Sequence, residues 1–537
     1  MVYVNITNEL KQYEADIRDL CLAFFPMQKI RFAIDLECKS NVIKDENTKT
    51  HSLSYENSDD IYIKDFFSGK LCENRNINKS EIKRQLYNYL SKKTGKVLLW
   101  GTLTGIRPVT IVTKMIDDID SCEETYKETK GYMKVLGLSP IGDIDNKIYK
   151  ENELLLKRLK DEYYISDEKA YELIKIARNE ISILKREKVK DYKKSYSIYI
   201  GVPFCKSTCL YCSFTSFNID KYSDYIDKYL LAFETELRKR FDVVNYNNGY
   251  NGLDKDKNQK LDYGKKYKPL TLYVGGGTPT SLDEKSFERF LNTVDKYIDT
   301  ENCIEYTIEA GRPDTITENK LKLMKEHKVT RISINPQTFN QKTLDLIGRK
   351  HTVKEIIEKY RLARKIGFDN INMDIILGLP NEHLFDVIKT ILNLYRLKPD
   401  SLTIHSLALK RAARLNYELD SWTKKYYLAG MKNYTIEGKR EIDVMFKLGK
   451  NLSEIMNLKP YYLYRQKNMA GNLENIGFAK VGKECIYNIM MMSERHSVYG
   501  FGTATTKEVF YENAGVRIES TEGYKSVTDY CNSILVN

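Results

Sequence analysis

Between about residues 195 and 410 the chain alternates short β-rich runs with longer amphipathic stretches, in which apolar residues recur at helical spacing. Six repeats of strand then helix predict a parallel sheet, because parallel neighbours need long crossover connections. Right-handed crossovers then leave few topologies. The predicted strands are Ile198–Phe204, Leu270–Val274, Ile304–Ile308, Arg331–Asn335, Ile371–Leu377 and Ser401–Leu407. The predicted helices include Tyr222–Phe241, Asp283–Ile298, Glu318–His327 and Val353–Ile366.

Six such units in about 210 residues favour an α/β fold of the partial, open (β/α)6 barrel type, with an open doubly wound sheet as the alternative. Residues 1–185 mix strand-like and helical patterns and predict an N-terminal α+β domain with linking helices. Residues 190–410 form the predicted barrel. After that the alternation stops, and 411–537 predict a mostly helical C-terminal domain with a few strands. The polar segments Lys39–Asn76 and Asn245–Lys268 are predicted surface insertions.

Composition narrows the class of protein. The chain has 537 residues, of which 42% are apolar, and this is enough for a sizeable core. A disordered chain, a collagen-like repeat and a small disulfide scaffold are therefore excluded. No stretch reaches the roughly 18 unbroken apolar residues of a membrane span. Acidic residues near the start replace the apolar run of a signal peptide, so we expect a cytoplasmic protein without a membrane span.

The charge balance is basic, with 86 Lys and Arg against 74 Asp and Glu, a net charge of +12. Such a balance suits nucleic acid, anionic lipid or an acidic small molecule. Charges of both signs are interspersed along helix faces, however, which indicates ordinary solvated surface. We recognise no RNA-binding module and expect no nucleic-acid partner.

The strongest chemical signal is a C-x3-C-x2-C run directly after the first predicted strand, formed by Cys205, Cys209 and Cys212. Three thiolates on a short loop can hold three corners of a cubane iron–sulfur cluster. A structural zinc site needs a fourth ligand, and no Cys or His follows before Asn218. Zinc completed by a distant residue, or three unrelated thiols, are the alternatives. Since active sites gather at the carboxyl edge of parallel strands, later strand ends should supply the remaining site residues.

With these three cysteines after its first strand, the chain resembles the radical S-adenosylmethionine superfamily. Within that superfamily it is most similar to the oxygen-independent coproporphyrinogen III oxidases (dehydrogenases), in the branch called HemZ. The opening motif runs from Tyr199 to Cys205 and continues through Cys209 and Cys212. The resemblance implies a [4Fe-4S] cluster held by the three cysteines, with S-adenosylmethionine as the second cofactor. It also implies a catalytic contact of Tyr199 with S-adenosylmethionine near its sulfonium.

Further motifs follow at the later strands. Directly after one of them comes Gly275-Gly276-Gly277-Thr278, whose glycines let a ligand approach the backbone. By resemblance this segment receives the amino group of the methionine part. Read without the resemblance, it is a plain tight turn.

Four more residues are carried over from the family pattern. Glu309, which ends a strand, and Gln337 are implied to contact S-adenosylmethionine. Arg349 is implied to be catalytic, pairing with the methionine carboxylate or the substrate, since a guanidinium suits a carboxylate. Asp374, inside an apolar strand, is implied to contact the ribose hydroxyls. Helix caps or surface ion pairs are the plain alternatives, but the common position at strand ends favours one shared site.

The resemblance implies a radical reaction in heme biosynthesis. The reduced cluster cleaves S-adenosylmethionine, and the resulting radical takes hydrogen from a propionate, which loses carbon dioxide and becomes a vinyl group. Two such events convert coproporphyrinogen III to protoporphyrinogen IX. The implied partners are a porphyrinogen or heme-type molecule and a reducing electron donor such as flavodoxin or ferredoxin. Cationic anchors for the propionates are expected near the last strand, with a basic solvated helix start as the alternative. These anchors are His405, Lys410, Arg411 and Arg414.

The sequence departs from the family pattern in ways that bear on the substrate. Phe214 stands where characterised enzymes have a further Cys, and Pro313 follows Glu309 one residue later than usual. A heme chaperone is one alternative, but its His-Asn-x-x-Tyr-Trp motif is replaced here by a stretch starting at Tyr487. An anaerobic heme-degrading radical methyltransferase stays open as another. Residues 1–185 match only the HemZ branch, chiefly around Trp100, and 411–537 resemble the family's C-terminal domain patchily.

Overall fold

The computed structural model describes most of the chain and divides it into two compact units. Unit 1 comprises Met1–Lys175 with Arg465–Asn468, and unit 2 comprises Ile176–Tyr464 with Met469–Asn537. The described residues are 2–25, 30–35, 61–63, 78–105, 107–119, 144–189, 195–214, 216–241, 268–408, 410, 413–418, 421–422, 425–429, 435–436, 439–466, 469–512 and 515–536. The two predicted insertions therefore lie outside the described residues, apart from Ile61–Ile63 and Lys268.

Unit 1 is built on a small parallel sheet with helices packed against it. Its strands lie in the order β2-β1-β3. The helix α2 begins after Asn78, whose side chain accepts a hydrogen bond from the Glu81 backbone, and ends at Gly95 in the left-handed conformation. The strands and helices are β1 (Val2–Thr7), α1 (Glu14–Phe24), β2 (Ile30–Asp35), β3 (Ile61–Ile63), α2 (Lys79–Thr94) and α4 (Ile144–Tyr163), followed by α5 (Asp167–Arg186), which crosses into unit 2.

Unit 2 contains an eleven-stranded sheet whose centre is the predicted parallel array. Six strands pair in parallel in chain order, β4-β7-β8-β9-β10-β11. A helical crossover joins each of these strands to the next, so the partial (β/α)6 barrel is confirmed. The six strands are β4 (Ser195–Val202), β7 (Lys268–Gly276), β8 (Glu305–Glu309), β9 (Arg331–Ser333), β10 (Ile371–Leu377) and β11 (Ser401–Ser406).

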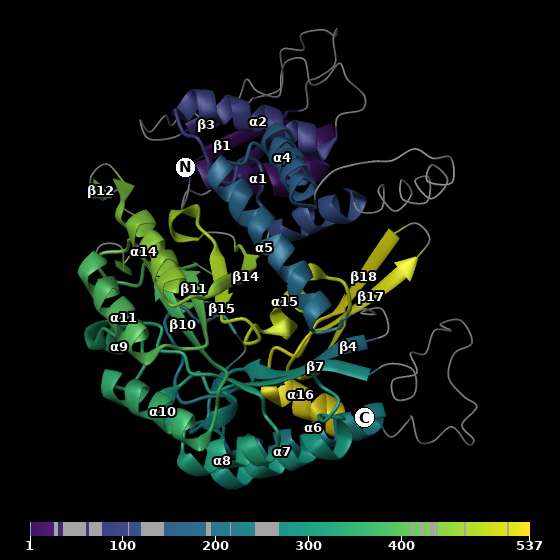
Figure 1. The fold of residues 1–537 in the computed structure, drawn as a ribbon, viewed down its shortest axis with the longest axis vertical. Coiled ribbons are helices and arrows are strands. Elements are labelled where there is room, and N and C mark those ends of the chain that lie inside the picture. The colour runs from purple at the N-terminus through teal and green to yellow at the C-terminus, as the bar shows by residue number, and fades with distance from the viewer. Residues whose placement is uncertain are drawn as a thin grey trace, which may run out of the picture. The chain divides into compact units, whose positions relative to one another are not determined.

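The crossover helices follow one another around the outer face of this sheet (Figure 1). Their starts agree with the sequence, because Asp283, Thr317, Asn340 and Thr352 each cap a helix with a side-chain oxygen. The apolar faces of these helices pack against the sheet. Loops occupy the carboxyl ends of the strands. The helices are α6 (Ile226–Phe241), α7 (Glu284–Tyr297), α8 (Glu318–Glu326), α9 (Gln341–Leu346), α10 (Val353–Ile366) and α11 (Leu384–Leu397).

The C-terminal region contributes both helices and strands to unit 2. Five of its strands extend the sheet at both sides of the parallel array. One pair continues antiparallel beyond β11, while another strand lies parallel to β4 and carries a hairpin. The elements are α12 (Arg414–Tyr417), β12 (Thr435–Ile436), β13 (Lys439–Arg440), α14 (Glu441–Ile455), β14 (Lys459–Tyr464), β15 (Asn475–Ala479), α15 (Ile486–Ser493), β16 (Ser497–Gly502), β17 (Thr506–Glu512), β18 (Gly515–Thr521) and α16 (Val527–Val536).

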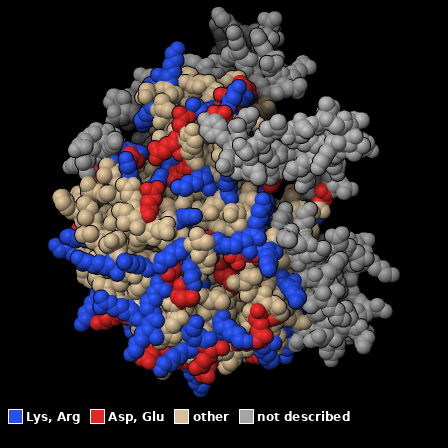
Figure 2. Space-filling view, viewed as in Figure 1, with Lys and Arg blue, Asp and Glu red and all other residues tan. Residues whose placement is uncertain are grey.

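The surface agrees with the interspersed charge of the sequence. Figure 2 shows Lys and Arg side chains mixed with Asp and Glu on the viewed face. Within the described ranges, no helix combines the length and apolar character needed to cross a membrane.

Candidate functional site

The three clustered cysteines lie on one loop beyond the carboxyl end of β4. We call residues 205–214 the cluster loop. A short parallel pair, β5 (Phe204–Cys205) with β6 (Phe217–Asn218), closes the base of this loop, and the Ile219 backbone donates to the Cys205 carbonyl at 2.9 Å. All three thiols are free and half-buried. The loop therefore presents three unpaired sulfur ligands at the predicted edge of the sheet.

Burial raises the pKa of the Cys205 thiol to about 11, although the Thr278 hydroxyl lies 3.2 Å from its sulfur and the effect of Arg312 also lowers it. The neighbouring thiols Cys209 and Cys212 raise it further, so the three sulfurs are near neighbours. Across the described residues, no three His, Cys, Asp or Glu side chains converge on a single ion position. A cubane cluster does not require such convergence, because each thiolate binds a different iron.

The predicted glycine segment lies against the base of the cluster loop. Gly277 donates from its backbone to the Val202 carbonyl at 2.7 Å, and Thr278 donates likewise to the Phe204 carbonyl at 2.7 Å. A Cβ on Gly277 would meet that Phe204 oxygen at 2.4 Å, so only glycine permits this approach. These backbone hydrogen bonds hold the end of β7 against the loop that carries Cys205.

Glu309 ends β8 and faces the glycine segment. A Cβ added to Gly275 would lie 2.9 Å from the Glu309 carboxyl carbon and 3.1 Å from the Tyr199 hydroxyl, so Gly275 keeps a small space open between these groups. The Tyr273 hydroxyl donates to Glu309 Oε1 at 2.7 Å. Burial raises the pKa of Glu309 to about 7 in spite of this hydrogen bond.

Three tyrosines form the wall behind this carboxylate. Tyr199 stacks on Tyr273 with 5.8 Å between ring centroids, and Tyr487 from α15 stacks on both, at 5.9 Å from Tyr199 and 4.6 Å from Tyr273. Burial raises the pKa of all three phenols. The hydroxyl groups therefore stay protonated at neutral pH, and the wall is uncharged.

Gln337 follows β9, and Asp374 lies within the neighbouring strand β10. The Gln337 backbone donates to the Asp374 carbonyl at 2.9 Å and adopts φ +66°, an uncommon conformation for a residue other than glycine. Gln337 is 9% exposed, and its Oε1 has no hydrogen-bond partner in the described part of the chain. This buried acceptor is available to the donor of a bound ligand.

Asp374 already has protein partners. Asn372 donates to its Oδ1 at 2.7 Å, and the His405 ring nitrogen lies 3.7 Å from its Oδ2. Burial raises the pKa of Asp374, but His405, Asn372 and Thr403 outweigh this and hold it below its ordinary value. The other ring nitrogen of His405 lies 3.3 Å from the Tyr464 hydroxyl. The contact of His405 with a substrate propionate, expected from the sequence, stays a prediction.

Arg349 is buried and ties the cluster loop to the strand ends. It donates to the Tyr211 hydroxyl at 3.2 Å, to the Asn335 carbonyl at 2.9 Å and to the Gly311 carbonyl. Its Nε has no hydrogen-bond partner within the ranges that the structure describes. The predicted role of Arg349 in pairing with a carboxylate thus depends on a group that is mostly engaged with backbone.

The basic segment after β11 meets the cluster loop. Lys410 Nζ lies 4.9 Å from the ring centroid of Phe214, and the backbone of Leu415 donates to the Leu210 carbonyl at 3.0 Å. The second contact brings the exposed Arg414 to the same loop. Arg411 lies outside the described residues.

These residues fit the two implied cofactors. Three free thiols on one loop match the ligand set of a cluster with one open iron. The space beside Gly275 and the partnerless Gln337 oxygen suit a small ligand with hydrogen-bond donors.

Sequence reasoning missed three contributors: Tyr273, Tyr487 and Arg312. The tyrosines carry no motif, and Tyr487 reaches the site from a distant part of the chain. A signal existed for Arg312, since it occupies the extra position before Pro313 that departs from the family pattern.

Comparison with known proteins agrees with this geometry. The sequence profile of the Radical SAM superfamily matches residues 199–394, which hold the parallel array and the cluster loop. The chain is therefore a radical SAM protein, and the cofactors of that superfamily are a [4Fe-4S] cluster and S-adenosylmethionine.

A curated relative then defines the family. The chain is 32% identical over 483 residues to the oxygen-independent coproporphyrinogen-III oxidase-like protein HemZ of Bacillus subtilis (strain 168), covering 89% of this chain and 81% of that protein. The chain belongs to this coproporphyrinogen oxidase-like family.

Other relatives share less of the chain. The heme chaperone HemW of Bacillus subtilis is 32% identical over 215 residues, which is 40% of this chain and 51% of that protein. Among solved structures, coproporphyrinogen III oxidase HemN from Escherichia coli aligns with 64% of this chain and 74% of its own, at 18% identity and a TM-score of 0.44.

Proposed function

We propose that this protein is an oxygen-independent coproporphyrinogen III dehydrogenase. It would convert two propionate side chains of coproporphyrinogen III to vinyl groups and give protoporphyrinogen IX. Each event removes one hydrogen atom from the propionate β-carbon, releases carbon dioxide and passes one electron to an external one-electron acceptor. When bound, the reduced cluster and S-adenosylmethionine supply one-electron chemistry able to take that hydrogen atom.

The residues of the chain would hold and orient the reactants. Cys205, Cys209 and Cys212 bind three irons and leave the fourth open. The backbone at Gly275–Gly277 and the Glu309 carboxylate receive the methionine part. The remaining contacts are those of Tyr199, Gln337, Arg349 and Asp374, as expected from the resemblance.

The wall of Tyr199, Tyr273 and Tyr487 would exclude water from the reacting groups. Because the phenols are uncharged, they line the site without adding a competing anion beside Glu309. This wall also bears on the heme-chaperone alternative, since Tyr487 occupies the start of the stretch that replaces the chaperone motif.

One observation carries the choice of substrate: the basic segment after β11 lies against the cluster loop. Lys410 is placed over Phe214, and Leu415 bonds to the loop next to Arg414. A tetracarboxylate needs cations close to the reacting centre, and these side chains would pair with propionates. The family relationship over 89% of the chain supports the same class of substrate.

The direct test is an oxygen-free assay with a chemical reductant, S-adenosylmethionine and coproporphyrinogen III, followed by product mass and absorbance. Vinyl-bearing product supports the proposal. A parallel reaction with heme separates the alternatives, because a linear tetrapyrrole would indicate heme degradation and stable heme binding without turnover would indicate a chaperone. Either result, without vinyl formation, contradicts the proposal.

A matched pair of variants ties the assay to the basic segment. Lys410→Gln should raise the KM for coproporphyrinogen III, whereas Lys425→Gln, in a later part of the same region, should leave it unchanged. We further propose a reducing donor of the flavodoxin or ferredoxin type and a cytoplasmic location.

A further inference from the structure

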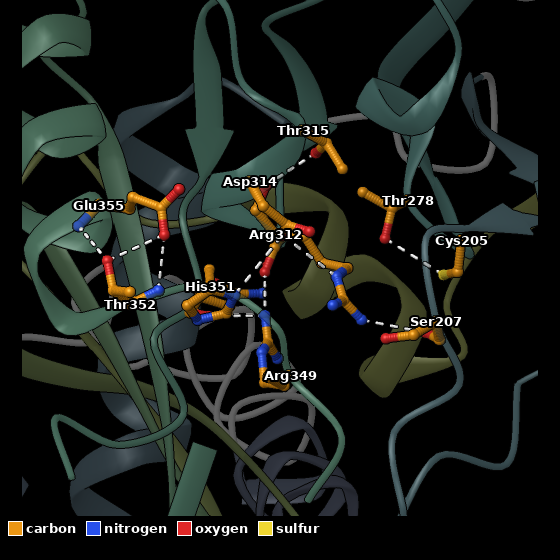
Figure 3. Close-up of polar contacts among 12 residues, drawn as sticks. Cys205, Ser207, Thr278, Arg312, Asp314, Thr315, Arg349, His351, Thr352 and Glu355 are labelled. Carbon is orange, nitrogen blue, oxygen red and sulfur yellow. Dashed lines mark hydrogen bonds and ion pairs between the residues drawn. The ribbon is translucent and has the colours of Figure 1, made fainter. Parts of the chain in front are cut away.

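Arg312 is a buried cation in direct contact with the cluster loop. It lies between Glu309, which ends β8, and the 3-10 turn Pro313–Thr315, and it is 3% exposed. One guanidinium nitrogen, Nη1, donates to the Ser207 carbonyl at 3.0 Å (Figure 3). The same nitrogen lies 3.8 Å from Cys209 Sγ. A single group therefore bridges two residues of the loop that carries the cysteines.

The position of Arg312 is fixed from several sides. Its carbonyl accepts hydrogen bonds from the Thr315 backbone at 3.0 Å and from the Thr315 hydroxyl at 2.7 Å. Its Nε donates to Asp314 Oδ1 at 3.4 Å, and the buried His351 ring lies 3.6 Å from the same oxygen. The guanidinium is thus held against the sulfur and has little freedom to turn away.

The contacts leave one donor unused. Nη2 of Arg312 is buried and has no hydrogen-bond partner among the described residues. Buried donors are normally paired, so this nitrogen is available to the acceptor of a bound group. The sulfides of an iron–sulfur cluster are acceptors of that kind.

Charge and hydrogen bonds at the sulfurs are among the factors that set the reduction potential of an iron–sulfur cluster. A cation stabilises the more negative, reduced form, and it does so strongly where water is excluded. Lys206 carries the same charge on the same loop, but it is exposed to solvent, where screening weakens its effect.

We propose that Arg312 raises the reduction potential of the cluster by donating to Cys209 and placing a buried positive charge beside it. This rests on the proposed function only in its cluster ligands, Cys205, Cys209 and Cys212. Arg312 would therefore help the physiological donor to reduce the cluster, whatever tetrapyrrole is the substrate.

The test compares Arg312→Gln, Arg312→Lys and the exposed control Lys206→Gln after reconstitution without oxygen. Iron content and visible absorption establish first that each protein holds its cluster. The midpoint potential is then measured by a dye-mediated titration followed by electron paramagnetic resonance, a readout that a purely structural role would not move.

We expect Arg312→Gln to lower the reduced-to-oxidised ratio about tenfold at a fixed potential, which is about 59 mV for one electron. Arg312→Lys should lower the potential by less, because lysine keeps the positive charge but lacks the planar guanidinium group with its several N–H donors. Lys206→Gln should match the wild type. Should Arg312→Gln lose its cluster, the shift of Arg312→Lys supports the proposal, and a wild-type potential in that variant overturns it.

A wild-type potential in a fully loaded Arg312→Gln protein overturns the proposal directly. If the three cysteines were not the cluster ligands, the result would differ from this one, because the wild type itself would then hold no cluster of about four irons.

Discussion

At the amino end of β11, Asp400 accepts hydrogen bonds from the Ile371 backbone at 3.0 Å and from Lys480 at 2.9 Å, and it pairs with Arg364 at 2.6 Å. At the carboxyl end of β8, Glu309 accepts one side-chain hydrogen bond, from Tyr273. Both carboxylates belong to the same parallel array. The Asp400 carboxylate is occupied by protein donors, whereas the Glu309 carboxylate can still accept hydrogen bonds from a ligand.

The contrast separates scaffold from site. A carboxylate whose partners are all fixed contributes to stability and offers nothing to a ligand. A buried carboxylate with few partners resists ionisation, as the raised pKa of Glu309 shows, and it gains most from a cationic ligand. Gln337 Oε1 and Arg312 Nη2, which have no hydrogen-bond partner among the residues described, are likewise available to a ligand.

The largest effect should come from the cysteines at the carboxyl edge. Cys205→Ala, Cys209→Ala and Cys212→Ala should each abolish cleavage of S-adenosylmethionine, because the cluster loses one of three ligands. Cys303→Ala, which removes a thiol next to the amino end of β8, should keep iron content and cleavage near the wild type. Cleavage at wild-type rate in any of the first three would contradict the ligand assignment.

The two carboxylates should respond in opposite ways to removal of their charge. Asp400→Asn should lower the free energy of unfolding by about 3 kcal/mol, since it leaves Arg364 and Lys480 without their anion, and should spare affinity for S-adenosylmethionine. Glu309→Gln should weaken that affinity with little loss of stability. Denaturant titration and calorimetric binding measure both quantities. Equal losses of stability in the two variants would contradict the assignment of Asp400 to the scaffold and of Glu309 to the ligand site.

The protonation state of Glu309 gives a pH-dependent prediction. Its pKa is raised to about 7, so the carboxylate ionises as pH rises from 6 to 8. Since a cationic ligand prefers the ionised form, affinity should rise about tenfold over this range. Glu309→Gln should show a smaller rise, because only the ligand's own titration remains. Identical pH profiles in the two proteins would show that Glu309 does not contact the ligand.

A smaller effect should follow from filling the space beside Gly275. The methyl group of Gly275→Ala would press on Glu309 and Tyr199, and affinity for S-adenosylmethionine should fall several-fold while the fold persists. Gly311→Ala is the matched control, since its nearest atom would be Asn335 Nδ2 at 3.5 Å, an ordinary contact. Calorimetric binding should separate the two, and equal affinities would place the ligand elsewhere.

The parallel array was predictable because its signal is local. Strand β10 has the predicted bounds Ile371–Leu377, and α10 has the predicted bounds Val353–Ile366. Alternation of buried strands with amphipathic helices also implies the order of neighbours. The strands β15 and β16 join the sheet through β11 and β4, which lie more than fifty residues away, and no periodicity in the sequence specifies such pairing.

The candidate site was predictable where a motif marks a residue type at a strand end, as for Cys205 and Glu309. Contacts that depend on packing were not. Nothing in the sequence places Tyr487 on Tyr199, or pairs Asp374 with His405. Arg312 had a visible signal, one extra residue before Pro313, but its contact with Cys209 arises only in three dimensions.

The most direct test of the account is electron paramagnetic resonance of the reconstituted, reduced protein with and without S-adenosylmethionine. The account predicts a cluster signal that changes when S-adenosylmethionine is added, because the fourth iron is open to it. A redox-silent metal, or a cluster signal that S-adenosylmethionine leaves unchanged, would contradict it.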